Sequence, residues 1–290
     1  MYRSRDLFLT ALAPAIWGST YLVATEYLPD GYPITIAMLR ALPAGMLLLL
    51  IVRRLPGREW WGKVFLLGAL NFSIFWALLF VAAYRLPGGV AATVGAVQPL
   101  IVIFLASALL GSPVRALSVV AGIAGMAGVA LLVLTPDASL DYVGVAAGVG
   151  GAFSMAAGTV LSRKWKPPVS LLTFTAWQLS AGGLLLLPLS LWLEPPLPAL
   201  STENFLGITY LGLIGAAFTY VLWFRGISRM EPSAISTLGF LSPVTALMLG
   251  WWVLDQHLNT IQITGFFAVL AGIWLSQFAA RQPRLAAAPA

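Results

Sequence analysis

The sequence predicts an all-α membrane protein with ten transmembrane helices, arranged as two inverted five-helix repeats around a central cavity. Three observations support this prediction. The 290 residues are 60% hydrophobic and only 9% charged, whereas a soluble domain carries about 25% charged residues. Apolar runs long enough to cross a bilayer recur along the chain, and basic residues gather in alternate connections between these runs.

Ten apolar runs reach the length that a transmembrane helix requires, about 20 mainly apolar residues. We place them at 7–26, 34–53, 63–83, 89–110, 115–134, 142–162, 170–192, 205–224, 233–254 and 260–279. The connections are short, and many contain Pro, Gly or acidic residues, as in Pro29-Asp30-Gly31 and Glu194-Pro195-Pro196. No connection is long enough for a soluble domain, and we expect residues 281–290 to form a disordered cytoplasmic tail.

Lys and Arg residues fall almost entirely on one side of the predicted membrane. Of the sixteen, fourteen lie in the terminal segments or in alternate connections; Arg85 lies in a connection on the other side, and Arg40 lies inside an apolar run. The positive-inside rule places the basic side in the cytoplasm. We therefore expect a multi-pass protein of the plasma (inner) membrane with both termini cytoplasmic.

The two halves of the chain resemble each other. Ala44-Gly45 in the second run recurs as Ala181-Gly182 in the seventh, and Gln98-Pro99 in the fourth recurs as Ser242-Pro243 in the ninth. Each half holds five runs, an odd number, so the second copy must be inverted relative to the first. We assign residues 1–136 to the first repeat and 137–280 to the second. Inverted repeats are typical of secondary transporters, whose substrate site lies near the membrane midplane where the repeats meet.

Short motifs in a fixed order resemble the drug/metabolite transporter superfamily, specifically its ten-span EamA-type transporters. The matching features are Trp17-Gly18-Ser19, Arg40, Pro99 with the Gly111 turn, and Pro243 followed by Gly250 and Leu254-Asp255. Many members carry Gly-Glu where this chain has Gly111-Ser112 and Asp255-Gln256. The resemblance implies a ten-helix fold with a central cavity and alternating access, typically for export of amino acids or other metabolites. The aromatic-rich interior is most similar to the aromatic amino-acid exporters of that group.

Arg40 is the first candidate for a substrate-binding residue. It lies about six residues into the second predicted span, and a charge within a span is costly and usually functional. One interpretation is an ion pair with Glu26, near the outer end of the first span, that orients two helices. The other is a guanidinium at the cavity mouth that attracts a substrate carboxylate. The sequence supports both equally.

The other candidates are polar or aromatic residues inside the predicted spans. They are Trp17, Asn71, Trp76, Gln98, Ser154, Trp177, Gln178, Tyr220 and Ser242. For each aromatic residue, packing against lipid or in the bundle core is an equal alternative. For each polar residue, the alternative is a hydrogen bond between helices, worth about 0.6 kcal/mol.

Two proline positions predict hinges. Pro99 and Pro243 lie near mid-span in repeat-related positions, and each removes the hydrogen bond to the carbonyl four residues back. The carbonyls released are those of Gly95 and Gly239. Glycine at both positions lets a neighbouring helix or a ligand approach the backbone closely. An ordinary proline kink is the alternative.

Several function classes are disfavoured by what the sequence lacks. There is no cysteine and one histidine, His257, so we expect no metal site and no other cofactor. No Asp or Glu lies deep in a span, which argues against a carrier of cationic drugs and against a proton relay. The basic residues are scattered membrane anchors, so we expect no nucleic-acid partner. The expected partners are a small-molecule substrate and the lipid bilayer; for the oligomeric state the sequence makes no prediction.

The main prediction is a secondary transporter that exports amino acids, with aromatic or large apolar ones favoured, by alternating access. The alternative is an exporter of another small metabolite, a nucleotide sugar or a drug. A nucleotide would require more than one cation in the cavity, and only Arg40 is available. An intramembrane enzyme is not expected, because the chain has no GxSxG, HExxH or paired Asp motif.

Overall fold

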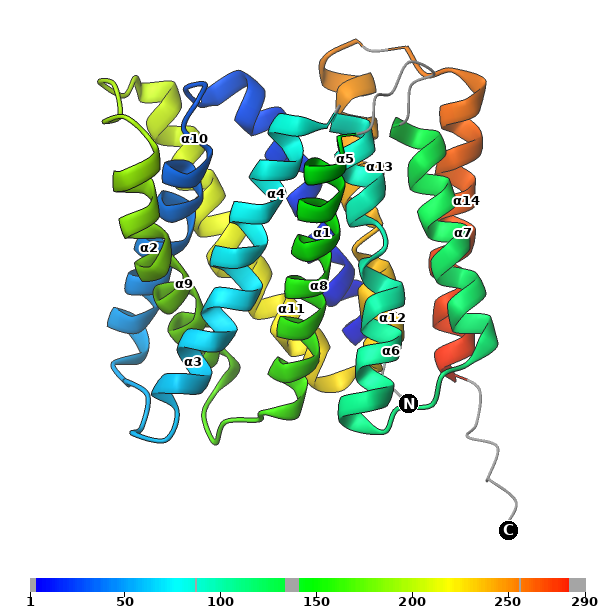
Figure 1. Ribbon diagram of the computed structural model, residues 1–290, viewed down its shortest axis with the longest axis horizontal. Coiled ribbons are helices and arrows are strands. Elements are labelled where there is room, and N and C mark those ends of the chain that lie inside the picture. The colour runs from blue at the N-terminus through cyan, green and yellow to red at the C-terminus, as the bar shows by residue number, and fades with distance from the viewer. Residues whose placement is uncertain (1–3, 87, 134–140, 256, 282–290) are drawn as a thin grey trace.

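The computed structural model describes residues 4–86, 88–133, 141–255 and 257–281. Its regular elements in these ranges are all helices (Figure 1), and ten helical stretches are long and apolar enough to cross a membrane. The predicted fold class is therefore confirmed. The elements are α1 Ser4–Tyr27, α2 Pro33–Val52, α3 Trp61–Gly68, η1 Ala69–Ser73, α4 Ile74–Arg85, α5 Gly88–Gly95, α6 Gln98–Leu110, α7 Ala116–Val133, α8 Tyr142–Lys164, α9 Leu171–Leu193, α10 Thr202–Gly212, η2 Leu213–Phe218, α11 Thr219–Arg229, α12 Pro232–Leu238, α13 Leu241–Val253 and α14 Thr260–Arg281.

Four of the ten spans are interrupted, at equivalent places in the two halves. Span 3 runs through α3, the π-helix η1 and α4, and span 8 runs through α10, the π-helix η2 and α11. Span 4 breaks between α5 and α6, and span 9 breaks between α12 and α13. The starts of η1 and η2 are 144 residues apart (69 and 213), as are the prolines after the two breaks (99 and 243). These matching irregularities support the repeat.

The predicted span ends agree with the structure to within three residues, except for the C-terminal end of the eighth span. The prediction was 205–224, whereas the helical stretch covers Thr202–Arg229. The prediction ended this span early because Arg225 and Arg229 look like residues of a connection. They remain helical because both pair with Asp6 of α1. A neutralised charge can stay at the end of a membrane helix at lower cost.

The most extensive helix packing joins equivalent spans of the two halves. α2 packs along α9 on one lateral side of the bundle, and α7 packs along α14 on the other side (Figure 1). Glycines permit these approaches: a Cβ at Gly183 would lie 2.6 Å from the Cα of Leu42, and one at Gly45 would overlap the backbone of Ser180. Small residues at helix crossings are the usual source of close packing inside a membrane.

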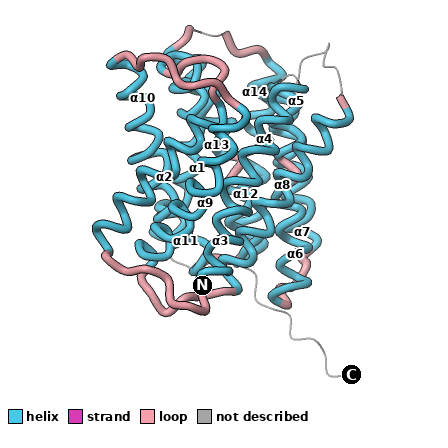
Figure 2. The backbone as a smooth tube through the Cα atoms, turned by 60° about the vertical axis from the view of Figure 1, so that its left-hand side comes forward, coloured by secondary structure: helices cyan, strands magenta, loops and turns pink. Residues whose placement is uncertain are grey.

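The connections gather at the two ends of the bundle (Figure 2). We call one end the basic face: α1 begins there, α14 ends there, and it carries the connections 53–60 and 165–170 (Figure 1). The other end is the opposite face. Arg281 still belongs to α14, one residue into the predicted tail. The rest of that tail and the predicted boundary between the repeats at residue 136 lie outside the described residues.

Candidate functional site

A backbone carbonyl released by η2 lies at the centre of the candidate site. In an α-helix the N–H of Thr219 would bond to the carbonyl of Gly215; here it reaches back to Ile214. The Gly215 carbonyl instead accepts hydrogen bonds from Arg40 Nη2 at 2.7 Å, Trp17 Nε1 at 3.2 Å and Thr219 Oγ1 at 2.8 Å. π-Helical turns frequently mark functional sites, and this one brings together two predicted site residues from different spans.

Arg40 extends its guanidinium from α2 into this region. Its Cζ lies 5.3 Å from the centroid of the Trp76 ring, within the range of a cation–π interaction. Its Nε is buried and has no hydrogen-bond partner. The ion pairs among the described residues do not join Arg40 to Glu26, which is exposed and accepts a bond from Thr25. A buried, unpaired N–H is costly, and a carboxylate would satisfy it.

A group of aromatic rings lies beside the guanidinium. Trp17 lies 5.0 Å from Tyr220 and 5.2 Å from Trp223, measured between ring centroids. Phe72 joins this group to Trp76, at 4.6 Å from Tyr220 and 5.4 Å from Trp76. These separations are typical of favourable aromatic pairs. We call Arg40 with these five rings the Arg40 cluster; it unites the predicted residues Trp17, Arg40, Trp76 and Tyr220.

A second polar group joins spans 3, 6 and 7. Asn71 Nδ2 donates to Gln178 Oε1 at 2.8 Å and to Ser162 Oγ at 3.3 Å. Ser162 Oγ also donates to Gln178 Oε1, at 3.4 Å. Asn71 Oδ1 and Gln178 Nε2 are buried without a partner. The structure therefore brings the predicted residues Asn71 and Gln178 together, with one acceptor and one donor unused.

Ser154 occupies the position in span 6 that Trp17 has in span 1, 137 residues earlier. Its hydroxyl donates to the carbonyl of Leu70 at 2.8 Å. That carbonyl is released by η1, because the N–H of Ile74 bonds to Ala69 instead. The two π-helices are therefore each bonded by a side chain from the first span of the other half.

Three further predicted residues belong neither to the Arg40 cluster nor to the contacts of Asn71, Gln178 and Ser154. Trp177 Nε1 donates to the carbonyl of Arg54 at 2.7 Å and so holds a connection of the basic face. The Gln98 and Ser242 side chains are half-buried, next to Pro99 and Pro243. The backbone of Ser242 lies directly against Gly18 of α1.

The hinge glycines differ from each other. The Gly239 carbonyl, which Pro243 cannot bond, accepts the N–H of Ser242 at 3.1 Å. A tighter turn thus restores the missing bond. An added Cβ would meet no atom within 4 Å at Gly95, whereas at Gly239 it would lie 3.1 Å from the carbonyl oxygen of Ser236.

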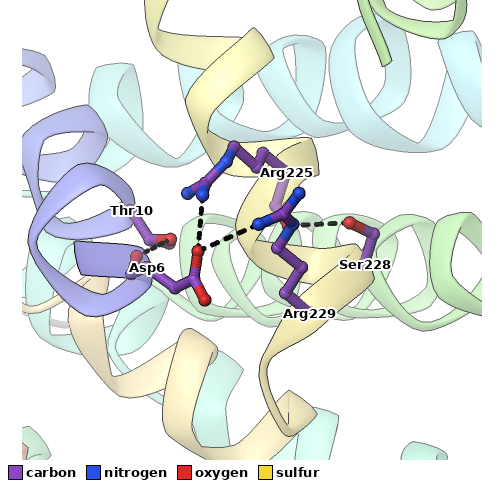
Figure 3. A network of polar contacts seen from close by, with 5 residues as sticks. All are labelled: Asp6, Thr10, Arg225, Ser228 and Arg229. Carbon is purple, nitrogen blue, oxygen red and sulfur yellow. Dashed lines mark hydrogen bonds and ion pairs between the residues drawn. The ribbon is translucent and has the colours of Figure 1, made fainter. Parts of the chain in front are cut away.

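Ion pairs link α1 to the end of α11 at the basic face (Figure 3). Asp6 Oδ1 accepts from Arg225 Nη2 at 2.5 Å and from Arg229 Nη1 at 3.3 Å. Thr10, one turn further along α1, donates to the Asp6 carbonyl at 2.6 Å. We call Asp6, Arg225 and Arg229 the Asp6 cluster. On the opposite face Arg85 Nη1 lies 3.6 Å from Asp141 Oδ2, and Arg85 and Arg229 occupy equivalent positions, 144 residues apart.

Two further arginines hold the turn that follows α11. Arg163 Nη1 donates to the carbonyls of Ile227, at 2.6 Å, and Met230. Arg115 forms an ion pair with Glu231. Spans 1, 5 and 6 are therefore all tied to the junction of spans 8 and 9 at the basic face.

Two cavities lie outside the Arg40 cluster. A cavity of about 180 Å³ opens at the basic face between α8, α9 and α11, and Ser162, Arg163, Lys166, Phe174 and Phe224 are among its lining residues. A second, of about 340 Å³, is a mainly apolar groove between α1, α13 and α14. Neither is lined by Arg40 or Trp17, whose surroundings are filled by aromatic rings. Within the described ranges, no group of three His, Asp or Glu residues could hold a metal ion.

Sequence reasoning missed Gly215, Ser162, Phe72 and Phe224 as members of these sites. Gly215 has no side chain, and its role depends on a π-helix. One signal was available: Gly215 lies 144 residues after Asn71, the offset that relates Pro99 to Pro243. Applying that offset to each polar candidate would have pointed to this position.

Comparison with known proteins matches both halves of the chain to the same family. The model of the EamA-like transporter family matches residues 5–134 and again residues 142–278. Protein PecM of Dickeya dadantii (strain 3937) is 44% identical over 267 residues, which cover 91% of this chain and 90% of PecM. The uncharacterized inner membrane transporter YedA of Escherichia coli (strain K12) is 30% identical over 253 residues, covering 85% of this chain and 82% of YedA. A solved crystal structure with 18% sequence identity has a TM-score of 0.83, covers 97% of this chain and shows the same fold.

Proposed function

The chain belongs to the EamA-like transporter family and is a secondary transporter, and on that premise we propose that it exports amino acids, with aromatic or large apolar ones favoured, by alternating access. One observation carries the proposal: a guanidinium with an unused N–H lies among aromatic rings in the interior of the bundle. Such a site combines a partner for a carboxylate with ring faces for an apolar side chain.

The chemistry of the Arg40 cluster fits an α-amino acid. Carboxylates bind arginine through short, charge-assisted hydrogen bonds that are about twice as strong as neutral ones. Arg40 uses Nη2 for the Gly215 carbonyl, so Nε remains for the substrate. The apolar side chain would replace ring–ring contacts around Phe72 and Tyr220.

The interruptions of spans 3, 4, 8 and 9 support rocking of the two repeats about the proline positions. The Asp6 cluster would hold the basic face closed, and Arg85 with Asp141 would do the same at the opposite face. We further propose that the basic face is cytoplasmic, as the positive-inside rule predicts. Export then requires that the Asp6 cluster opens to load substrate and closes before the opposite face opens.

Export of another small metabolite or a drug is the second candidate. A nucleotide sugar fits less well, because its phosphates would need several cations and the interior of the spans offers Arg40 alone. A cationic drug fits less well because no carboxylate lies deep in a span.

Counterflow in proteoliposomes tests the proposal. Purified protein is reconstituted with unlabelled L-phenylalanine inside, and uptake of radiolabelled L-phenylalanine is measured in competition with other amino acids, a nucleotide sugar and a cationic dye. We expect saturable counterflow that tryptophan, tyrosine, leucine and methionine inhibit. Loss of a charged hydrogen bond of about 1.5–3 kcal/mol predicts that Arg40→Ala raises KM roughly 10- to 100-fold. Arg58→Gln, in an exposed connection, is the matched control. Saturable counterflow of the nucleotide sugar or the dye, with none for any amino acid, would exclude the proposed substrate class.

A further inference from the structure

We propose that the 180 Å³ cavity at the basic face is a separate loading site, in which the amino acid binds before it reaches Arg40. The inference rests on the proposed function and adds a second binding site to it. The cavity lies between α8, α9 and α11 and opens where Lys166 and Pro167 leave the bundle.

The walls of this cavity combine cations with aromatic rings. Arg163 and Lys166 line it on the side of the 165–170 connection, and Phe174 and Phe224 line it towards the interior. Arg163 is held in place, because its Nη1 donates to the carbonyls of Ile227 and Met230. Lys166 is exposed. Two positive charges at the mouth favour a carboxylate, and the rings favour an apolar side chain.

The inner wall of the cavity leads directly to the Arg40 cluster. The Phe174 and Phe224 rings are 5.8 Å apart, and Phe224 is 5.9 Å from Tyr220, which belongs to that cluster. A substrate that passes Phe174 and Phe224 would therefore next meet the Tyr220 ring of that cluster.

Ser162 gives the cavity a polar inner corner. It lines the cavity and belongs to the buried group in which Asn71 Oδ1 and Gln178 Nε2 have no partner. Unused hydrogen-bonding groups this deep in a membrane protein are costly. Neither Asn71 nor Gln178 lines the cavity itself, so an ammonium or carboxylate group that enters past Ser162 would remove that cost. Together with the cations and the aromatic rings, these polar groups favour a zwitterion with an apolar side chain as the ligand.

The absence of cysteine from the chain makes a direct test feasible. Ser162→Cys is reconstituted, and its modification by a charged, membrane-impermeant thiol reagent is measured from each side of the membrane. We expect reaction from the basic face, slowed at least tenfold by L-phenylalanine with a saturable dependence on concentration. Ser190→Cys is the matched control: Ser190 is equally buried, lies on α9 and is remote in sequence from the cavity-lining residues. It should show no protection by phenylalanine.

A second variant separates this inference from the proposed function. Lys166→Gln should raise the KM for phenylalanine presented at the basic face several-fold, without changing the KM at the opposite face. If wild-type protein carries phenylalanine but phenylalanine does not protect Ser162→Cys, the loading site is wrong and the proposed function stands. If Lys166→Gln changes both faces equally, the loading site is likewise wrong. Protection of Ser162→Cys without counterflow of any amino acid would support the site and overturn the proposed function.

Discussion

Breaking the Asp6 cluster should make the basic face open more often. Asp6→Asn keeps the size of the side chain and removes its charge. The side chain of Asp6 is 9% exposed and that of Arg225 is 17% exposed, whereas Arg229 is 53% exposed. Removing one partner of a buried pair costs about 3–5 kcal/mol, and an exposed pair is worth about 0.2–1 kcal/mol. Since Asn can still accept one hydrogen bond from Arg225, we expect a loss of about 2 kcal/mol, or roughly 30-fold in the closed-to-open equilibrium.

The rate of thiol modification at Thr10→Cys measures that equilibrium. Thr10 is fully buried one turn behind Asp6, so a charged reagent reaches this position only when the basic face is open. Adding Asp6→Asn should raise the rate roughly 30-fold, by the free-energy change derived above.

Asp141→Asn is the matched change at the opposite face. The Arg85–Asp141 pair is 3.6 Å long, and its side chains are 50% and 40% exposed. Asn can also replace Asp141 as the cap of the Gly144 N–H. We therefore expect less than about a threefold change at Thr10→Cys. An Asp6→Asn rate within threefold of the parent, or an Asp141→Asn effect of equal size, would show that the Asp6 cluster does not hold the face closed.

Two stability predictions concern α2, one for its packing against α9 and one for the cap at its N-terminus. Gly45→Ala should lower the free energy of unfolding by about 1–3 kcal/mol, because the new Cβ overlaps the Ser180 backbone. Gly62→Ala, where the Cβ meets open space, should leave the free energy of unfolding unchanged. Thermal melts in detergent compare the two variants, and equal melting temperatures would contradict the packing argument. Glu194→Gln should cost about 1 kcal/mol, because both carboxylate oxygens accept the first N–H groups of α2, at 2.6 and 2.7 Å. Glu26→Gln, at an exposed position, is the control for charge alone, and a melting temperature as low as that of Glu194→Gln would exclude the capping role.

The spans and their repeat were predictable because membrane crossing imposes a length and a polarity that a single sequence displays directly. The breaks in spans 4 and 9 were also predictable, since Pro99 and Pro243 each remove a helical hydrogen bond. The π-helices were not predictable, because neither Ala69–Ser73 nor Leu213–Phe218 contains a proline that would mark an interrupted helix. The environment of Trp177 was equally hidden: its partner is the carbonyl of Arg54, which only the tertiary structure brings near.

Arg40 shows why a charge inside a span indicates function without specifying geometry. Its position in the sequence allowed a pair with Glu26 or a role in the cavity. The structure adds the acceptor that the sequence could not display, a carbonyl released by η2 in a distant part of the chain. Burial of Nε without a partner is likewise a property of the packed bundle.

The π-helices and the ion pairs of the two faces follow the repeat, whereas the candidate binding groups depart from it. Trp17 and Ser154 bond equivalent π-helices, and Arg229 and Arg85 pair with Asp6 and Asp141 at equivalent places on the two faces. The same offsets relate Arg40 to Trp177 and Asn71 to Gly215, pairs with no chemistry in common. A carrier that opens alternately to two faces needs matching hinges and closures in its halves. One small zwitterion, however, needs one cation and one set of acceptors. A single substrate site between two inverted repeats therefore requires that the two halves differ at its binding groups, as they do at Arg40 and Asn71.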